Sequence, residues 1–266
     1  MVRAIKNIDE RNYAAARRLD SIISIASPIA LLLLWEIAAR LGLIDVRFFP
    51  APTQIFRSVI TMAQSGELLD NTLISLQRLF LGFLLGGIPA LILGIVMGIS
   101  RPVRAFFEPL ISATYPIPKS SILPLVLLIF GLGEMSKVVM VAIGAFYPIA
   151  INATAGVLQI NKVYLDVGRT FKAGRWQTFR TIALPGALPF IMTGVKLGAG
   201  FGLILIAIAE MVGAKSGLGY MIWSAWETFS VEKMYVGLFV IGIIGFVITL
   251  LLNELERQLI PWNVKQ

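Results

Sequence analysis

The sequence contains no cysteine and no histidine. These absences exclude disulfides, thiolate nucleophiles, and metal sites or catalytic triads that depend on histidine. Charge is scarce as well: 14% of the 266 residues are charged and 57% are hydrophobic, whereas globular domains carry about 25% charged residues. The composition therefore indicates a membrane protein. The net charge of +8 then fits basic cytoplasmic loops better than nucleic-acid binding.

Apolar runs long enough to cross a bilayer recur along the chain. A spanning helix needs about 20 mostly apolar residues, and helices are the form that satisfies the backbone of such runs in lipid. We therefore predict an all-α membrane protein with six transmembrane helices in one domain, 22–260, between a cytoplasmic segment 1–21 and a cytoplasmic tail 261–266. The expected spans are about 22–41, 79–100, 107–131, 138–158, 186–210 and 234–252.

The basic residues orient these spans. With the N-terminus inside, 14 basic residues fall on inner segments and five on outer loops, which agrees with the positive-inside rule. Both termini are then cytoplasmic. The long first outer loop is expected to hold an interfacial helix that begins at Pro52, with a plain connecting loop as the alternative.

Glycines recur four residues apart in two of the expected spans. Small residues at this spacing let helices approach closely, either within one subunit or between two copies. The glycines concerned are Gly82, Gly86, Gly94 and Gly98 in the second span, and Gly194, Gly198 and Gly202 in the fifth.

A charged segment, LDVGRTFKAGRWQTFRTIALP, separates the fourth and fifth spans over residues 165–185. Helical spacing places Val163, Val167 and Phe171 on one apolar stripe. The pair Ala173-Gly174 is expected to break this helix.

A second short helix is expected to follow, with Trp176 and Phe179 on one side. Pro185 then stands at the start of the fifth span, where a missing N–H is tolerated. The whole segment is either a basic loop that only fixes the topology or a docking surface for a cytoplasmic partner.

The same segment resembles the EAA loop of importer permeases of ATP-binding-cassette transporters, a pattern of E-A-A-x-x-x-G, nine residues and I-x-L-P. The ending is matched by Ile182, Leu184 and Pro185. Asp166 replaces the glutamate, Val167-Gly168 replaces two alanines, and Lys172 stands in the glycine position, so Gly174 is expected to supply the turn.

Other stretches between about Trp35 and Trp262 are similar to the nitrate, sulfonate, taurine and bicarbonate branch of these permeases. They are SLQRLFLGFLLGGIPALILGIVMG, ILPLVLLIFGLGEMSKVVMVAIGAFYPIAINATAGV, LPGALPFIMTGVKLGAG and AEMVGAKSGLGYMI.

The resemblance implies a division of labour. Two permease copies, as a homodimer, would line the pathway, while an extracytoplasmic solute-binding protein delivers the substrate. Two cytoplasmic ATPase subunits would grip the coupling loop, 161–184, and bind ATP and Mg. This chain lacks a G-x-x-x-x-G-K-[ST] phosphate loop and would be neither an enzyme nor a cofactor carrier. The residues assigned to ATPase coupling are Val163, Asp166, Val167, Gly168, Arg169, Phe171, Lys172, Gly174, Arg175, Trp176, Phe179, Ile182, Leu184 and Pro185.

Lys119 is a charge within an expected span, where charges usually face protein or water. Prolines around it free backbone groups that can line a cavity. We predict that it faces the translocation pathway and attracts an anion, the alternatives being a structural pair with an acid or snorkelling. The residues assigned to the pathway are Pro118, Lys119, Ser120, Ser121 and Glu210.

Glu210 is expected either in a structural ion pair or in contact with substrate. Its candidate partners are Lys119, Lys196 and Lys215. Trp223 and Trp226 would lie in an interface belt or form a lid over the pathway.

The resemblance, together with these features, implies a permease subunit of an ATP-driven importer in a bacterial plasma membrane, which would work by alternating access. Its substrate would be a small anion such as a sulfonate, taurine, nitrate or bicarbonate, with neutral or heterocyclic solutes as the alternative. A secondary transporter driven by an ion gradient is the competing class, but it would favour inverted repeats and several intramembrane carboxylates.

Overall fold

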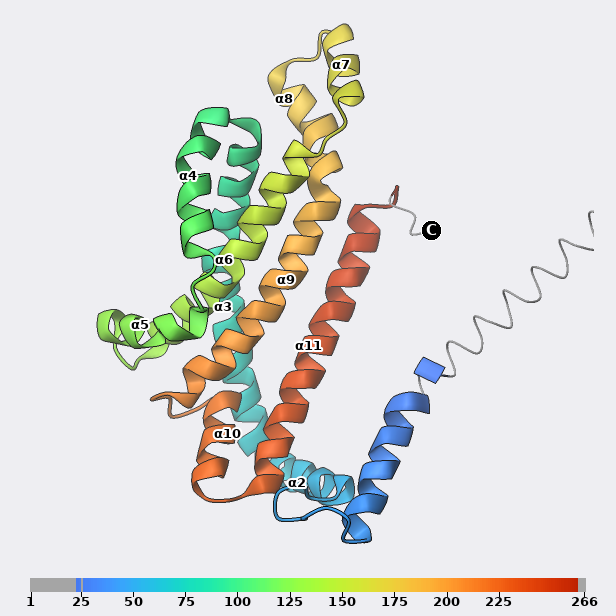
Figure 1. Ribbon diagram of the computed structural model, residues 1–266, viewed down its shortest axis with the longest axis vertical. Coiled ribbons are helices and arrows are strands. Elements are labelled where there is room, and N and C mark those ends of the chain that lie inside the picture. Colours follow the sequence, from blue (N-terminus) through green and yellow to red (C-terminus); the bar gives the residue numbers. More distant parts are fainter. Residues whose placement is uncertain (1–22, 25, 263–266) are drawn as a thin grey trace, which may run out of the picture.

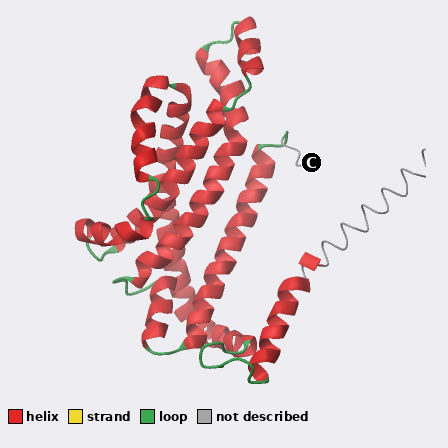
Figure 2. Ribbon diagram, viewed as in Figure 1, coloured by secondary structure: helices red, strands yellow, loops and turns green. Residues whose placement is uncertain are grey.

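The computed structural model describes residues 23, 24 and 26–262. The expected cytoplasmic segment 1–21 and residues 263–266 of the tail lie outside the described residues. All regular structure in the described ranges is helical, without a strand (Figure 2). This confirms the predicted all-α class.

Four long apolar helices run side by side through the molecule (Figure 1). Each is long and apolar enough to cross a membrane. Together they contain the expected spans 138–158, 186–210 and 234–252, and all but the last residue of the expected span 79–100. A further helix over residues 26–40 belongs to the first expected span. The four long helices are α3 (Glu67–Ile99), α6 (Glu134–Leu158), α9 (Leu184–Met211) and α11 (Val231–Leu259).

The segment expected as a span over 107–131 is bent. It consists of α4 (Arg101–Thr114), then the 3-10 turn η1 (Lys119–Ile122) and α5 (Leu123–Phe130), and its two halves meet at 91°. The bend falls at Pro116 and Pro118, because proline lacks the N–H that would continue the helix and restricts the residue before it.

The core is α6, packed between α3 and α9. A Cβ atom added at Gly82 or Gly86 of α3 would fall against Val138, Val141 or Ala142 of α6, and one at Gly194 of α9 would lie 2.9 Å from the carbonyl oxygen of Pro148. The predicted glycine contacts are therefore confirmed within one subunit.

Short helices lie at the two ends of this bundle (Figure 1). At one end, called the α10 end, are α2 (Pro52–Gln64) and α10 (Leu218–Glu227). At the opposite end, called the α7 end, are α7 (Lys162–Thr170), α8 (Arg175–Thr178) and the π-helical turn η2 (Phe179–Ala183). The short helix expected from Pro52 is present, and it buries Ile55 and Met62.

Candidate functional site

The charged segment forms two short helices that project beyond the bundle at the α7 end (Figure 1). The predicted stripe of Val163, Val167 and Phe171 is exposed on α7 and just after it, and the ring of Phe171 is 81% exposed. On α8, Trp176 stacks on Phe179 with ring centroids 5.5 Å apart and is 71% exposed. The chain thus presents apolar side chains that it does not bury itself.

The turn between α7 and α8 is made by Lys172 and not by Gly174. Lys172 has φ of 53°, and the N–H of Ala173 donates to the carbonyl of Gly168 at 2.9 Å, which is the hydrogen bond of a Schellman helix end. This position usually holds glycine, because the left-handed conformation costs other residues about 1–2 kcal/mol. The expectation that Gly174 supplies the turn is therefore wrong. Lys172, which stands where the family pattern has glycine, adopts the left-handed conformation itself.

Gly168 explains how α7 folds back onto the start of α9. It is buried, and a Cβ atom there would lie 3.0 Å from Cδ1 of Ile182. Beyond Ile182, Leu184 packs on the cluster of Ala153, Ala187 and Ile191. The I-x-L-P residues therefore anchor the segment, and Pro185 stands in the first turn of α9. The side chains of Arg169 and Arg175 lie outside the described part of the structure, while Asp166 is exposed.

The second short helix runs into α9 without a break. Residues Trp176–Met211 form one helical rod of 36 residues. The rod begins in the exposed segment at the α7 end and finishes one residue after Glu210 at the α10 end.

Lys119 lies at the bend of the broken segment and forms no ion pair with any residue that the structure describes, while snorkelling stays a prediction. Its ammonium donates to the carbonyls of Thr114 at 2.8 Å and Tyr115 at 3.1 Å, and lies 3.9 Å from the ring centroid of Tyr147. It thus caps carbonyl groups that α4 leaves free at its C-terminus. Pro118, Ser120 and Ser121 beside it are exposed.

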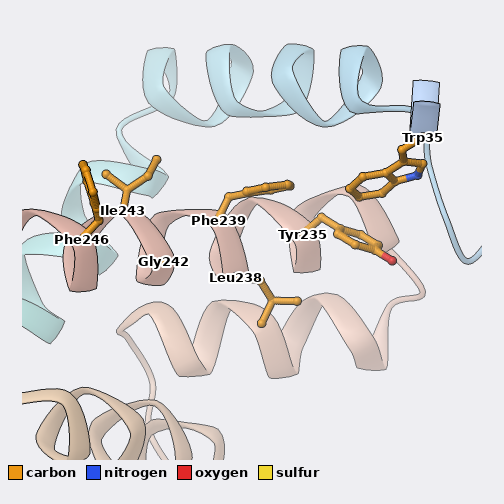
Figure 3. A pocket seen from close by; sticks show the side chains of 7 residues that line it. All are labelled: Trp35, Tyr235, Leu238, Phe239, Gly242, Ile243 and Phe246. Atoms are coloured by element: carbon orange, nitrogen blue, oxygen red, sulfur yellow. The ribbon is translucent and has the colours of Figure 1, made fainter. Parts of the chain in front are cut away.

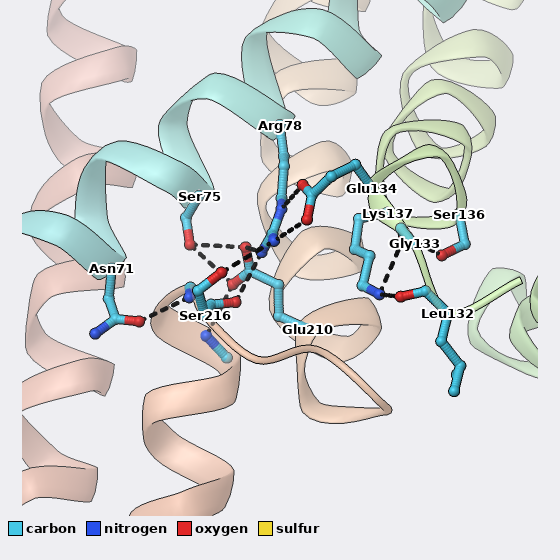
Figure 4. Close-up of polar contacts among 12 residues, drawn as sticks. Asn71, Ser75, Arg78, Leu132, Gly133, Glu134, Ser136, Lys137, Glu210 and Ser216 are labelled. Atoms are coloured by element: carbon cyan, nitrogen blue, oxygen red, sulfur yellow. Dashed lines mark hydrogen bonds and ion pairs between the residues drawn. The ribbon is translucent and has the colours of Figure 1, made fainter.

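Glu210 is buried in a polar cluster at the α10 end (Figure 4). Its partner is Arg78 of α3, with a nitrogen–oxygen distance of 2.9 Å, so the expected lysine partners are wrong. The side chains of Arg78 and Glu210 are 4% and 0% exposed. The expected structural ion pair is present, and contact of Glu210 with substrate stays a prediction.

Arg78 uses all of its donors in this cluster. One edge of its guanidinium binds both oxygens of Glu134 at 2.6 Å, while Nη1 reaches Glu210 and the carbonyl of Ser216, and Nη2 also reaches the Ser216 hydroxyl. A guanidinium has five N–H donors in a planar fork, and each finds an acceptor here. Helices α3, α6 and α9 are therefore joined through one side chain.

The same cluster caps the N-terminus of α10. Three consecutive backbone N–H groups, of Gly217, Leu218 and Gly219, donate to Asn71, Ser75 and Glu210 at 2.7–2.9 Å. The first N–H groups of a helix have no partner within it, and a carboxylate there also interacts favourably with the helix dipole. Gly217 has φ of 109° and leaves no room for a Cβ atom beside the Glu210 carboxylate.

Most of this cluster was not predicted from the sequence. No role was expected for Asn71, Ser75, Arg78, Glu134 or Ser216. The available signal was Arg78, which directly precedes an uncharged apolar run and so called for a buried acid as its partner.

Lys196 and an apolar groove both lie against α11. Lys196 of α9 binds Asn253 at 2.6 Å and pairs with Glu256 of α11, so it is structural. An apolar groove between Trp35 and α11 (Figure 3) is lined by aromatic and aliphatic side chains. The hydroxyl of Tyr235 in this groove donates to the carbonyl of Phe48, and the buried indole N–H of Trp35 has no partner among the described residues. The lining carries no charged side chain that would bind a charged solute.

Comparison with known proteins places these features in context. Residues 90–263 match the family described as "Binding-protein-dependent transport system inner membrane component". The chain is 37% identical over 249 residues to the taurine transport system permease protein TauC of Escherichia coli, covering 91% of this chain and 90% of that protein.

Two other relatives and one solved structure are also similar. The putative aliphatic sulfonates transport permease protein SsuC of Bacillus subtilis is 31% identical, over 89% of this chain and 86% of its own length. The nitrate import permease protein NrtB of Synechocystis is 31% identical, over 72% and 70%. A chain of the inward-facing MetNI methionine ABC transporter superposes with a TM-score of 0.64 at 19% identity, over 74% of this chain and 98% of that one, and so shares the fold.

Proposed function

Since the chain belongs to the family of inner membrane components of binding-protein-dependent transport systems, we propose how this permease subunit is arranged and coupled. It crosses the plasma membrane six times, with the bent segment α4–η1–α5 as the third crossing and the helix over 26–40 as part of the first. The α7 end is then cytoplasmic together with both termini, in agreement with the excess of basic residues on those segments. The α10 end faces outward.

The exposed segment at the α7 end is the coupling surface, defined as α7, α8 and the turn between them. The observation that carries this assignment is the exposed stripe of Val163, Val167 and Phe171 on a segment continuous with the rod Trp176–Met211. An apolar stripe ringed by charge fits a groove on a protein partner. Each coupling surface binds one of two cytoplasmic ATPase subunits, which hold ATP and Mg.

Transport follows from movement of this surface. When the ATPase subunits close, each displaces its coupling surface, and α9 carries the displacement towards the cluster of Arg78, Glu134 and Glu210. Two permease copies then alternate between openings to the outside and to the inside. An extracytoplasmic solute-binding protein delivers the substrate to the α10 end.

The substrate we propose is a small anion of the sulfonate type, taurine included. Relatives named for taurine, aliphatic sulfonates and nitrate support this class. Lys119 supplies a positive charge at the bend, and Ser120 and Ser121 supply exposed hydroxyl groups beside it. Pro118 contributes by keeping the backbone of this stretch out of a regular helix.

The coupling assignment is tested with Phe171→Ala, in membranes that also contain the ATPase subunits. Phe171 contributes little to folding because its ring is 81% exposed. We expect loss of ATPase co-purification and a fall in transport of at least about tenfold, with thermal stability unchanged. Phe246→Ala, an exposed aromatic of α11, is the matched control and should leave both readouts intact. If the ATPase still co-purifies with Phe171→Ala and transport persists, the assignment fails.

A further inference from the structure

Two residues in the described part of the chain share an uncommon backbone conformation. Lys172 and Phe229 are the non-glycine residues there with positive φ, each at 53°. Lys172 lies two residues after α7, in the coupling surface, and Phe229 lies two residues after α10. These two helices are at opposite ends of the bundle (Figure 1).

Phe229 occupies the glycine position of a Schellman helix end. Its N–H donates to the carbonyl of Trp226 at 3.1 Å, and the N–H of Ser230 donates to that of Ala225 at 2.8 Å, which are the two bonds of the motif. A phenylalanine here costs free energy that glycine would not. Packing within the chain does not offset this cost, because Phe229 is 85% exposed. Strain at such an exposed position points to a role outside the chain.

The neighbouring residues extend this apolar feature. The rings of Trp223 and Trp226 lie 4.8 Å apart and are both exposed, and Trp223 donates to Glu227 at 3.0 Å. Trp223, Trp226 and Phe229 are together called the aromatic tip.

A polar hollow begins at the residue after Phe229. Ser230 lines it together with Arg57 of α2 and Glu232 of α11. Lys233 and Glu67 also line it and pair with each other at 3.0 Å, whereas neither Arg57 nor Glu232 forms an ion pair with any residue the structure describes. Charges of both signs beside the tip suit a watery surface and not hydrocarbon. An aromatic centre with a polar rim is the anatomy of a protein interface.

We propose that the aromatic tip and this hollow form the docking surface for the extracytoplasmic solute-binding protein. Phe229 is the apolar anchor, and Arg57 and Glu232 meet opposite charges on the binding protein. The inference rests on the proposed function, because that function places the α10 end outside the membrane. The inference adds to that function by assigning the contact with the binding protein to named residues on α2, α10 and α11.

Two substitutions at one position test the anchor. Phe229→Asn removes the ring, and asparagine tolerates the left-handed conformation, so the helix end should stay intact. Phe229→Tyr keeps the ring and is the matched control. Each variant is assembled with its ATPase subunits in nanodiscs, and the affinity for the purified solute-binding protein of the same transport system is measured by biolayer interferometry. Basal and binding-protein-stimulated ATP hydrolysis are measured in parallel.

We expect Phe229→Asn to raise the Kd of the binding protein at least about tenfold and Phe229→Tyr to change it less than about twofold, with basal hydrolysis equal to wild type in both. A Kd unchanged in Phe229→Asn overturns the docking surface. Two other results would also overturn it. If the two permease copies of Phe229→Asn separate in light scattering, the tip contacts the second copy. If Phe229→Asn dissociates from lipid while its affinity for the binding protein is unchanged, the tip contacts lipid. A wild-type complex that neither binds the protein nor responds to it overturns the proposed function itself.

Discussion

The guanidinium of Arg78 donates to the carboxylate of Glu210 over 2.9 Å, with both side chains removed from solvent. This contact ties the far end of the rod Trp176–Met211 to α3, while the near end of the rod carries the exposed coupling surface. Glu134 brings α6 into the same cluster. The three helices of the core are thus fixed to one another at the α10 end, and the proposed coupling surface lies at the opposite end.

Removal of Arg78 should be severe. Arg78→Met would leave the Glu210 charge buried without its partner, and breaking a buried pair in this way costs about 3–5 kcal/mol. Glu134→Gln changes the other carboxylate of the cluster, but Glu134 is 70% exposed and glutamine keeps an acceptor oxygen for Arg78, so this change should cost less than the loss of Arg78. Thermal unfolding of the two purified variants in one detergent measures the difference. Equal midpoints would show that the buried pair does not hold the α10 end together.

The contact of α3 with α6 should tolerate no added methyl group at Gly86. A Cβ atom there would collide with the backbone of Ala142, whereas a Cβ atom at Gly200 of α9 meets nothing within 4 Å. We expect Gly86→Ala to destabilise the fold by about 2–3 kcal/mol and Gly200→Ala to be neutral or slightly stabilising. The yield of monodisperse protein in size-exclusion chromatography reports both. A stable Gly86→Ala variant would contradict the close packing.

The turn of the coupling surface should improve when its lysine becomes glycine. Lys172→Gly keeps the left-handed conformation without the steric cost of a side chain and should stabilise the turn by about 1 kcal/mol. Slower amide hydrogen exchange in α7 would report this gain. Gly174→Ala is the control, because a Cβ atom there meets nothing within 4 Å. If Lys172→Gly does not stabilise the turn and Gly174→Ala destabilises it, Gly174 and not Lys172 makes the turn.

Hydropathy located the long helices well but could not see their polar ends. The second span was expected from residue 79, whereas α3 begins at Glu67. The first four turns of α3 carry Asn71, Ser75 and Arg78, and a search for apolar residues does not detect such polar side chains. Their partners are up to 146 residues away along the chain, so no local pattern reveals them.

Local conformation was equally hard to read from the sequence. The prolines showed that the segment around Lys119 is interrupted, but not that its halves meet at 91°. At the coupling surface the family pattern marked Lys172 as a departure, and the glycine nearby was the natural place for the turn. The backbone instead turns at Lys172, which has φ of 53°, and the N–H of Ala173 closes the helix end onto the carbonyl of Gly168.

Lys119 can act on the substrate, on the bend, or on both, and two variants separate these roles. Lys119→Met removes the charge together with the hydrogen bonds to Thr114 and Tyr115, whereas Lys119→Arg keeps a charge and donors to carbonyl groups. If Lys119 attracts the anion, uptake of a sulfonate into vesicles that contain the whole transporter should fall at least about tenfold in Lys119→Met. Uptake should persist in Lys119→Arg, and thermal stability should differ between the two by no more than about 1 kcal/mol. If uptake falls in both variants only as far as the amount of folded protein falls, Lys119 has only a structural role, as the cap of the carbonyl groups at the end of α4. Normal uptake by Lys119→Met would remove it from the pathway.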